Sequence, residues 1–136
     1  MLFVIHIKID IYRLSRYDTL LYNYYKLTTM PSAIIVEDEV LASERLRVLL
    51  EECQVVLLKT FHHAQPALDW LSVHEVDIVF ADIGLPEMNG LEFVERIKRV
   101  AKKQPHVIFT TAYEEHALRA FELAAADYLL KPIKLA

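Results

Sequence analysis

The stretch of sequence that most constrains the fold is residues 76–90, which read VDIVFADIGLPEMNG. Its first part is a short apolar run that ends in a carboxylate, Asp82, and its second part contains a proline and two glycines. An acid at the C-terminal end of a buried parallel strand lies at the edge where open α/β sheets bind their ligands. We therefore interpret 76–81 as a strand of a parallel sheet and Asp82 as a candidate functional residue.

Three further apolar runs also end in polar residues. Glu37 and Asp38 follow one run, Thr111 ends another, and Lys131 follows the last. Clustered carboxylates raise one another's pKa unless a cation neutralises them. Mg²⁺ prefers oxygen ligands and needs only one or two carboxylates beside phosphate oxygens. The pattern therefore predicts a Mg²⁺ site at which Asp82 acts as a nucleophile toward phosphorus.

The chain after Met30 alternates apolar strand patterns with helical patterns, which is typical of βαβ units and a parallel sheet. The predicted strands are 33–37, 55–60, 76–81, 106–110 and 127–130. The predicted helices are 40–52, 64–73, 90–102 and 114–125. In the first helix, the side chains expected to face the sheet are Leu41, Leu46, Leu49 and Leu50. A fifth helix is expected after the last strand, and the sequence stops at Ala136 with that helix missing.

Composition excludes several classes of protein. The 136 residues suffice for one domain with a core, and 54% of them are hydrophobic, which argues against disorder. The net charge of -4 argues against sequence-independent nucleic-acid binding. A single cysteine, Cys53, fits a reducing compartment, and no apolar run reaches the roughly 18 residues of a membrane span. We expect a cytoplasmic domain that does not bind membranes, and the two glycines exclude a P-loop.

Each candidate residue also has a simpler interpretation when it is taken alone. A lone acid at a strand end is more often a helix cap or a turn residue than a nucleophile. Thr111 could cap a helix, Lys131 could be an ordinary strand exit, and Tyr128 could only pack at an edge. The adjacent His62 and His63 lack the spacing of metal ligands on a helix and are interpreted as solvated or loop histidines.

The ordered combination is far more specific than any of its parts. It consists of Glu37-Asp38, Asp82, Thr111-Ala112 and Lys131-Pro132. This set resembles the receiver domain of two-component response regulators, and the resemblance covers about 33–132. It implies a flavodoxin-like, doubly wound α/β fold with a five-stranded parallel sheet in the order 2-1-3-4-5.

The resemblance also implies a role for each matching residue. Asp82 would be the phosphoacceptor, and Thr111 and Lys131 would sense the phosphoryl group. The implied Mg²⁺ ligands are Glu37, Asp38, Asp82 and the backbone carbonyl of Gly84. The implied switch pair is Thr111 and Tyr128. Glu37 stands where the family usually has Asp, a variation compatible with metal binding through water.

The sequences of residues 109–113 and 126–133 are similar to those of receivers attached to LytTR-type DNA-binding domains. This finer resemblance implies a histidine kinase as partner and a phosphorylation switch that regulates transcription through an output domain of a parent protein. Homodimerisation on activation is a further implication. The chain itself is expected to bind no nucleic acid.

Residues 1–29 have no counterpart in that family, so the predicted organisation is an extra segment over 1–29 and a receiver domain over 30–136. Residues 17–27 could form a helix that covers the sheet face left open by the missing helix, within one chain or between two chains. The alternative is that residues 1–29 form an unpacked tail. The resemblance to receiver domains also implies a cis Lys131–Pro132 bond, which X–Pro bonds in tight turns permit.

Two other functions are compatible with part of this pattern. A phosphohydrolase of the haloacid-dehalogenase class needs a second Asp two residues after the nucleophile, where this chain has Gly84. A degenerate receiver that serves only as a protein-binding module is disfavoured by the intact Asp82, Thr111 and Lys131.

Overall fold

The computed structural model describes residues 31–112 and 127–131, and for 127–130 it describes the backbone alone. The strands are β1 (Ser32–Val36), β2 (Val56–Phe61), β3 (Ile78–Asp82), β4 (His106–Thr111) and β5 (Asp127–Leu130). The helices are α3 (Val40–Glu52), α4 (Ala64–Leu71) and α5 (Gly90–Val100). The predictions for 1–29, for a helix over 114–125 and for the bond to Pro132 lie outside the described residues.

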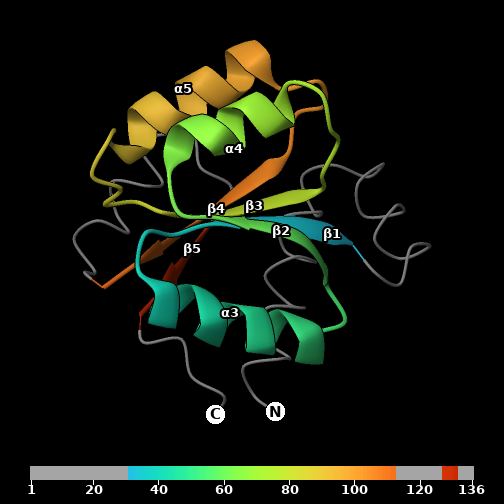
Figure 1. Ribbon diagram of the computed structural model, residues 1–136, viewed down its shortest axis with the longest axis vertical. Helices are drawn as coiled ribbons and strands as arrows, with labels where there is room; N and C mark the ends of the chain where they lie inside the picture. Colours follow the sequence, from blue (N-terminus) through green and yellow to red (C-terminus); the bar gives the residue numbers. More distant parts are fainter. Residues whose placement is uncertain (1–30, 113–126, 132–136) are drawn as a thin grey trace.

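The five strands form one parallel sheet in the order β2-β1-β3-β4-β5, as predicted. Helices α4 and α5 cover one face of this sheet and α3 lies on the other face (Figure 1). The doubly wound α/β architecture is therefore confirmed. Because every strand runs in the same direction, the C-terminal ends of β1, β3, β4 and β5 meet at one edge of the sheet.

Successive side chains along each strand point to opposite faces of the sheet, and this divides the core into two clusters. In β1, Ile34 and Val36 pack in the cluster beneath α4 and α5, whereas Ala33 and Ile35 pack in the cluster beneath α3. All four side chains have no exposed surface. Successive side chains of a strand point to opposite faces, so an unbroken apolar run is what a strand covered on both faces requires.

The prediction for Leu41 is wrong. Leu46, Leu49 and Leu50 are buried against the sheet as predicted, but Leu41 is 76% exposed. A helix turns by about 100° per residue, so Leu41 lies about 140° to 180° around α3 from Leu46 and Leu50. Leu41 therefore lies on a side of the helix that does not face the sheet.

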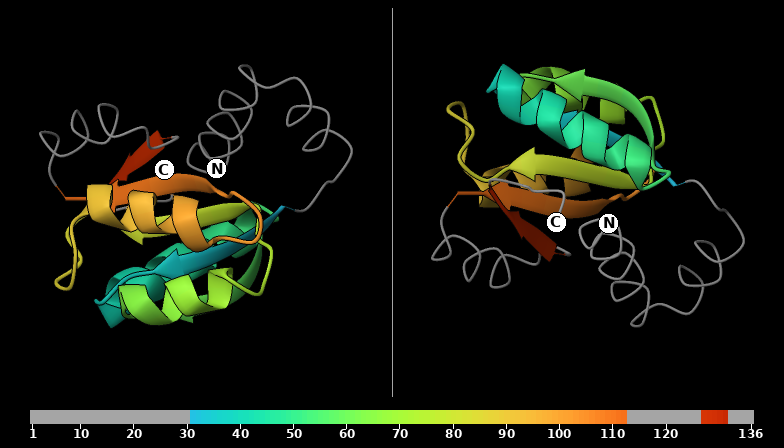
Figure 2. Two further views of the ribbon diagram at one scale, coloured as in Figure 1. Left: turned by 90° about the horizontal axis from the view of Figure 1, so that it is seen from above. Right: turned by 90° about the horizontal axis from the view of Figure 1, so that it is seen from below.

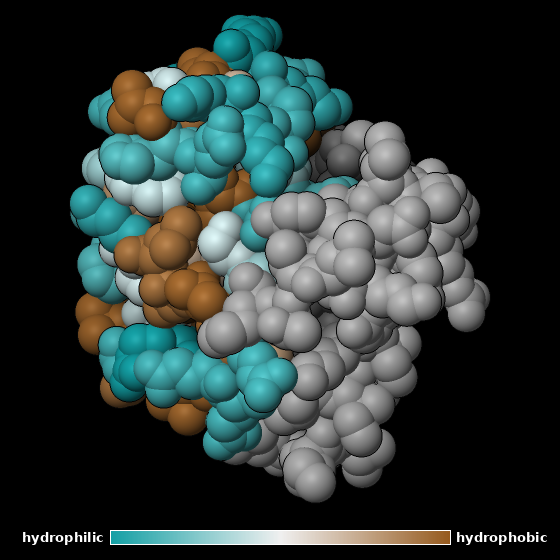
Figure 3. Space-filling view, turned by 90° about the vertical axis from the view of Figure 1, so that its right-hand side faces the viewer, coloured by the Kyte–Doolittle hydropathy of each residue, from teal (hydrophilic) through white to brown (hydrophobic). Residues whose placement is uncertain are grey.

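Helix α3 covers only part of its face. Seen from below, α3 lies toward the β1 and β2 side of the sheet, and no helix of the described residues lies over β5 on that face (Figure 2). At the other edge, β2 carries the exposed side chains of Val56 and Leu58. Apolar surface is visible in the band between the two helical layers (Figure 3). A register shift between β1 and β2 leaves Leu58 unpaired, an irregularity typical of edge strands.

Candidate functional site

Three carboxylates meet at the C-terminal edge of the sheet. Glu37 and Asp38 follow β1, and Asp82 is the last residue of β3. One carboxylate oxygen from each lies within 4.8 Å of the other two. Glu37 is buried, Asp82 is partly buried and Asp38 is exposed, so the cluster is open to solvent on one side. The structure brings together the three acidic residues that the sequence nominated.

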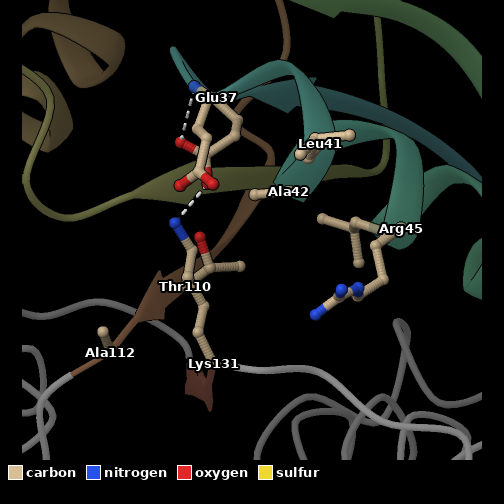
Figure 4. Close-up of a pocket in the computed structure, with 9 residues that line it drawn as sticks. Glu37, Leu41, Ala42, Arg45, Thr110, Ala112 and Lys131 are labelled. Atoms are coloured by element: carbon tan, nitrogen blue, oxygen red, sulfur yellow. Dashed lines mark hydrogen bonds and ion pairs between the residues drawn. The ribbon is translucent and has the colours of Figure 1, made fainter.

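Lys131 completes this cluster from the end of β5. Its Nζ donates hydrogen bonds to Glu37 Oε1 and to Asp82 Oδ2, the latter over 3.3 Å. Figure 4 shows the Lys131 amine directed toward the Glu37 carboxylate. Only 19% of the Lys131 side chain is exposed, so water screens its attraction to the two carboxylates only weakly. The sequence placed Lys131 at the site but did not predict its contact with Glu37.

The loop after β3 orients Asp82. The backbone N–H of Gly84 donates to Asp82 Oδ1 over 2.9 Å, and the N–H of Ile83 donates to the Thr110 carbonyl over 3.0 Å. One carboxylate oxygen of Asp82 thus accepts a backbone hydrogen bond while the other faces Lys131. The loop therefore holds the carboxylate in one orientation.

Burial controls the protonation of Glu37. Its pKa is raised to about 7, chiefly because burial disfavours the charged form and also because the Asp82 carboxylate lies beside it. The Lys131 ammonium acts in the opposite direction on this pKa. Burial alone would lower the pKa of Lys131, but its contacts with Glu37 and Asp82 raise it above the usual value. The site is an acidic cluster balanced by one amine.

A hard divalent cation fits this donor set. Oxygen ligands from one or two carboxylates, with an open side for water and phosphate oxygens, are what Mg²⁺ prefers. The cation would relieve the repulsion among carboxylates that otherwise rely on Lys131. Glu37, Asp38 and Asp82 are the side chains that could hold it.

The two predicted switch residues lie on neighbouring strands. Thr111 is 1% exposed and pairs with Leu130 across β4 and β5, and its carbonyl accepts the N–H of Lys131 over 2.6 Å. The backbone of Tyr128 pairs with Phe109. The side chain of Tyr128 lies outside what the structure describes, so its predicted movement remains a prediction.

A cavity of about 330 Å³ adjoins the acidic cluster. It lies between α3 and the strand ends, and its lining includes Glu37, Leu41, Ala42, Arg45 and Lys131 (Figure 4). This position explains the exposure of Leu41, whose side chain faces the cavity instead of the sheet.

Two contacts near the site were missed by the sequence. His62 Nδ1 lies 2.9 Å from the carbonyl oxygen of Glu37, and Glu87 Oε1 accepts the N–H of Ala64 over 3.0 Å. His62 is exposed, in keeping with the prediction of a solvated or loop histidine, but its contact with Glu37 is not predicted by the sequence. The sequence does show that α4 lacks a local cap, because His63 stands where a capping Ser, Thr, Asp or Asn is usual, but it does not show that Glu87 supplies one.

A family model and curated relatives both match this chain to response regulators. The sequence matches the response regulator receiver domain family over residues 33–136. It is 43% identical over 100 residues to the transcriptional regulatory protein YpdB of Escherichia coli K12, covering 73% of this chain and 41% of YpdB. It is 40% identical over 104 residues to the sensory transduction protein LytT of Bacillus anthracis, covering 76% of this chain and 42% of LytT. The chain thus spans about two fifths of the length of these relatives.

Among solved structures, the response regulatory domain of MrkE from Klebsiella pneumoniae is similar, with a TM-score of 0.65 and 39% identity. The match covers 74% of this chain and 83% of the MrkE chain. Within the described part of the chain, no helix combines the length and the apolar character needed to cross a bilayer.

Proposed function

This chain belongs to the response regulator receiver domain family, in its LytTR-type branch, and on that basis we propose that Asp82 accepts a phosphoryl group from a histidine kinase. The family acts in two-component phosphorelay signalling, where receiver domains interact with histidine kinases or phosphotransfer proteins. A receiver domain is a regulatory module and not a conventional enzyme. The assignment of this chain's own residues is our proposal.

The proposal rests on the grouping of three acids at the ends of β1 and β3, two of which, Glu37 and Asp82, pair with the Lys131 amine after β5. Asp82 presents Oδ2 toward Lys131 over 3.3 Å, while Gly84 holds Oδ1. In the proposed reaction an Asp82 oxygen forms a bond to phosphorus as the bond between phosphorus and the donor's histidine nitrogen breaks. Lys131 would then offset the negative charge of the transferred group.

Mg²⁺ is the proposed cofactor, with Glu37, Asp38, Asp82 and the carbonyl of Gly84 as its ligands. When bound, it would neutralise charge on the carboxylates and on the phosphoryl oxygens. The match of oxygen donors to a hard cation supports this choice. Glu37 must be ionised to take part, and Lys131 favours that ionised form.

Signalling requires that the phosphorylated site alter another surface. We propose that the Thr111 hydroxyl donates a hydrogen bond to the phosphoryl group and that Tyr128 responds as the switch. The position of Thr111 at the buried end of β4 supports its role. We also propose that this change is relayed to a DNA-binding output domain of a parent protein. The proposed setting is the cytoplasm, and the phosphorylated receiver would form a homodimer.

A direct test uses acetyl phosphate as phosphodonor with Mg²⁺. We expect the intact mass to increase by one phosphoryl group and peptide mapping to locate it on Asp82. Asp82→Asn should abolish the increase, whereas Asp69→Asn, on the exposed surface of α4, should leave it unchanged. Modification of another residue, or normal modification of Asp82→Asn, would refute the proposal. Hydrolysis of simple phosphate monoesters would favour a phosphohydrolase instead.

The proposed domain organisation, an extra segment over 1–29 and a receiver over 30–136, has its own test. A protein starting at Met30 should be phosphorylated at the rate of the full chain. If residues 17–27 cover the open sheet face, their deletion should lower the melting temperature and promote aggregation in light scattering. An unchanged melting temperature with a monodisperse product would show that 1–29 is a passive extension.

A further inference from the structure

Helix α4 begins without a cap of its own. Its N-cap residue, His63, has an extended backbone and makes no side-chain capping hydrogen bond. The cap comes from 23 positions later in the chain, because Glu87 Oε1 accepts the N–H of Ala64 over 3.0 Å. The same oxygen lies 3.0 Å from His63 Nδ1. A carboxylate at this position satisfies an otherwise unpaired N–H, and its negative charge interacts favourably with the positive end of the helix dipole.

The Glu87 carboxyl responds to this environment. Partial burial alone would raise its pKa, but hydrogen bonds from the N–H groups of Glu87 and Ala64, with His63 beside them, hold the pKa below the usual value. The carboxyl is therefore ionised when it caps α4. Only 31% of its side chain is exposed.

Glu87 lies in the loop that follows Asp82, and the rest of that loop is also anchored. Leu85 and Met88 are buried in the core cluster beneath α4 and α5. Asn89 Oδ1 accepts the N–H of Glu92 over 2.9 Å and so caps α5. Glu87 adds a polar anchor to α4 between two apolar ones. The loop is thus fixed against both helices on this face.

The start of α4 is connected to the other acidic loop as well. The N–H of Glu37 donates to the Phe61 carbonyl over 2.8 Å, and His62 Nδ1 lies 2.9 Å from the Glu37 carbonyl oxygen. Residues 61–64 therefore contact the loop that carries Glu37 on one side and the loop that carries Asp82 on the other. This short junction braces the two loops against each other.

We propose that Glu87 is a positioning residue for phosphoryl transfer, which holds residues 83–89 against α4 so that Asp82 and Gly84 keep the orientation that attack on phosphorus requires. This inference rests on the proposed function of Asp82. The side chain of Glu87 contacts His63 and Ala64, so in this role it would act through the loop and not by touching the phosphoryl group. Reactions depend steeply on the placement of the reacting groups, so a loosened loop slows transfer even in a folded protein.

Two substitutions at Glu87 separate its parts. Glu87→Ala removes the hydrogen bond to Ala64, and the partly exposed position makes unfolding of the whole domain an unexpected result. Glu87→Gln keeps an oxygen that can accept the Ala64 N–H and should rescue the function. Glu92→Gln is the matched control, because Glu92 is a half-exposed carboxylate at the start of α5 whose side chain pairs with Arg96.

A further control separates positioning from loss of stability. The Asp77 carboxylate binds Ser32 at the opposite edge of the sheet. Asp77→Ala should lower the melting temperature at least as much as Glu87→Ala does, without loosening the loop at Asp82. A rate that simply followed stability would fall in both variants.

The rate of Asp82 phosphorylation by acetyl phosphate at saturating Mg²⁺ is the first readout, measured where all variants are folded. We expect Glu87→Ala to be slower by about 3- to 10-fold, the factor that corresponds to a lost helix cap. Glu87→Gln, Glu92→Gln and Asp77→Ala should stay within about twofold of the unmodified protein. A normal rate in Glu87→Ala, or equal slowing in Asp77→Ala, would overturn the proposal.

Amide hydrogen exchange of the metal-free protein is the second readout. Glu87→Ala should exchange faster than the unmodified chain in residues 62–68 and 83–89, and Asp77→Ala should not. Unchanged exchange in both segments would show that Glu87 does not hold the loop. If the unmodified protein fails to accept a phosphoryl group, the proposed function of Asp82 is refuted, while exchange still decides whether Glu87 anchors the loop.

Discussion

The Asp77 carboxylate accepts a hydrogen bond from the backbone N–H of Ser32 over 2.8 Å, although 45 positions of sequence separate the two residues. The Ser32 hydroxyl donates to the same oxygen over 3.1 Å. Lys103 Nζ lies 3.0 Å from the other carboxylate oxygen of Asp77. Asp77 is 8% exposed, so these contacts are largely shielded from water. They join the beginnings of β1 and β3 to the segment that follows α5.

Replacing Asp77 by Ala should therefore lower the free energy of unfolding by about 2–3 kcal/mol, because Ser32 loses a charged acceptor. Urea unfolding followed by the fluorescence of Trp70 measures this difference. Glu75→Ala, at an exposed position nearby, should change it by less than about 0.5 kcal/mol. Equal stability of the two variants would contradict the structural role of Asp77.

The same residue predicts a pH dependence. Burial alone would raise the Asp77 pKa, but hydrogen bonds from Ser32 and Lys103 bring it below its ordinary value of 3.8. A depressed folded-state pKa stabilises the protein above the unfolded pKa, and this stabilisation disappears as the pH falls through the folded value. The difference in stability between the unmodified protein and Asp77→Ala should be constant above about pH 5 and should shrink below pH 3.8. A difference that grows on acidification would reverse this assignment.

Gly90 tests the packing behind the loop of Asp82. A Cβ at Gly90 would lie 2.9 Å from Ile83 Cγ1 and 3.0 Å from Phe109 Cζ. Phe109 has no exposed surface and little freedom to move, so Gly90→Ala should cost about 1–3 kcal/mol of stability. Gly84→Ala is the matched control, because its Cβ would meet Asp82 Oδ1 at an ordinary 3.6 Å. Comparable losses in the two variants, measured by urea unfolding, would argue against close packing at Gly90.

Mg²⁺ binding should depend on pH through Glu37. The pKa of Glu37 is raised to about 7, so below pH 7 the metal must displace a proton. The affinity for Mg²⁺ should therefore increase by up to about tenfold for each unit by which the pH rises toward 7, and should level off above pH 7. Titration calorimetry between pH 5.5 and 8.5 measures this trend, and Glu37→Gln should flatten it. A flat profile in the unmodified protein would exclude Glu37 as a ligand.

Asp38 offers an independent test of the metal site, because Asp38→Asn should abolish Mg²⁺-dependent phosphorylation. Normal phosphorylation of that variant would contradict the proposed metal site.

Lys131 should stabilise the metal-free state. Its Nζ pairs with Glu37 and Asp82, so Lys131→Met leaves a buried carboxylate without its cation. At pH 8 the free energy of unfolding should decrease by about 1–3 kcal/mol, and added Mg²⁺ should recover part of the loss. Lys102→Met, at an exposed position, should be neutral. A Lys131→Met protein as stable as the unmodified one would show that the contact contributes little.

The sequence alone determined the sheet, its alternation with helices and the location of the acidic cluster. Unbroken apolar runs such as 76–81 predict strands covered on both faces, and the carboxyl ends of parallel strands meet at one edge. Glu37, Asp38 and Asp82 could therefore be grouped before any contact was known. Helical periodicity likewise predicts the burial of Leu46 and Leu50, whereas the prediction for Leu41 is wrong because Leu41 lies on another side of α3.

Only the tertiary structure decided which distant side chains meet. The contacts of Glu87 with Ala64, of Lys131 with Glu37 and of Asp77 with Ser32 span 23, 94 and 45 positions. Each depends on how a loop is placed over a neighbouring strand or helix, and no local pattern encodes that placement. The raised pKa of Glu37 has the same origin, because it follows from burial and from the approach of Asp82. Residue type and spacing predict which chemistry gathers at a sheet edge, whereas packing sets the distances and the burial that tune it.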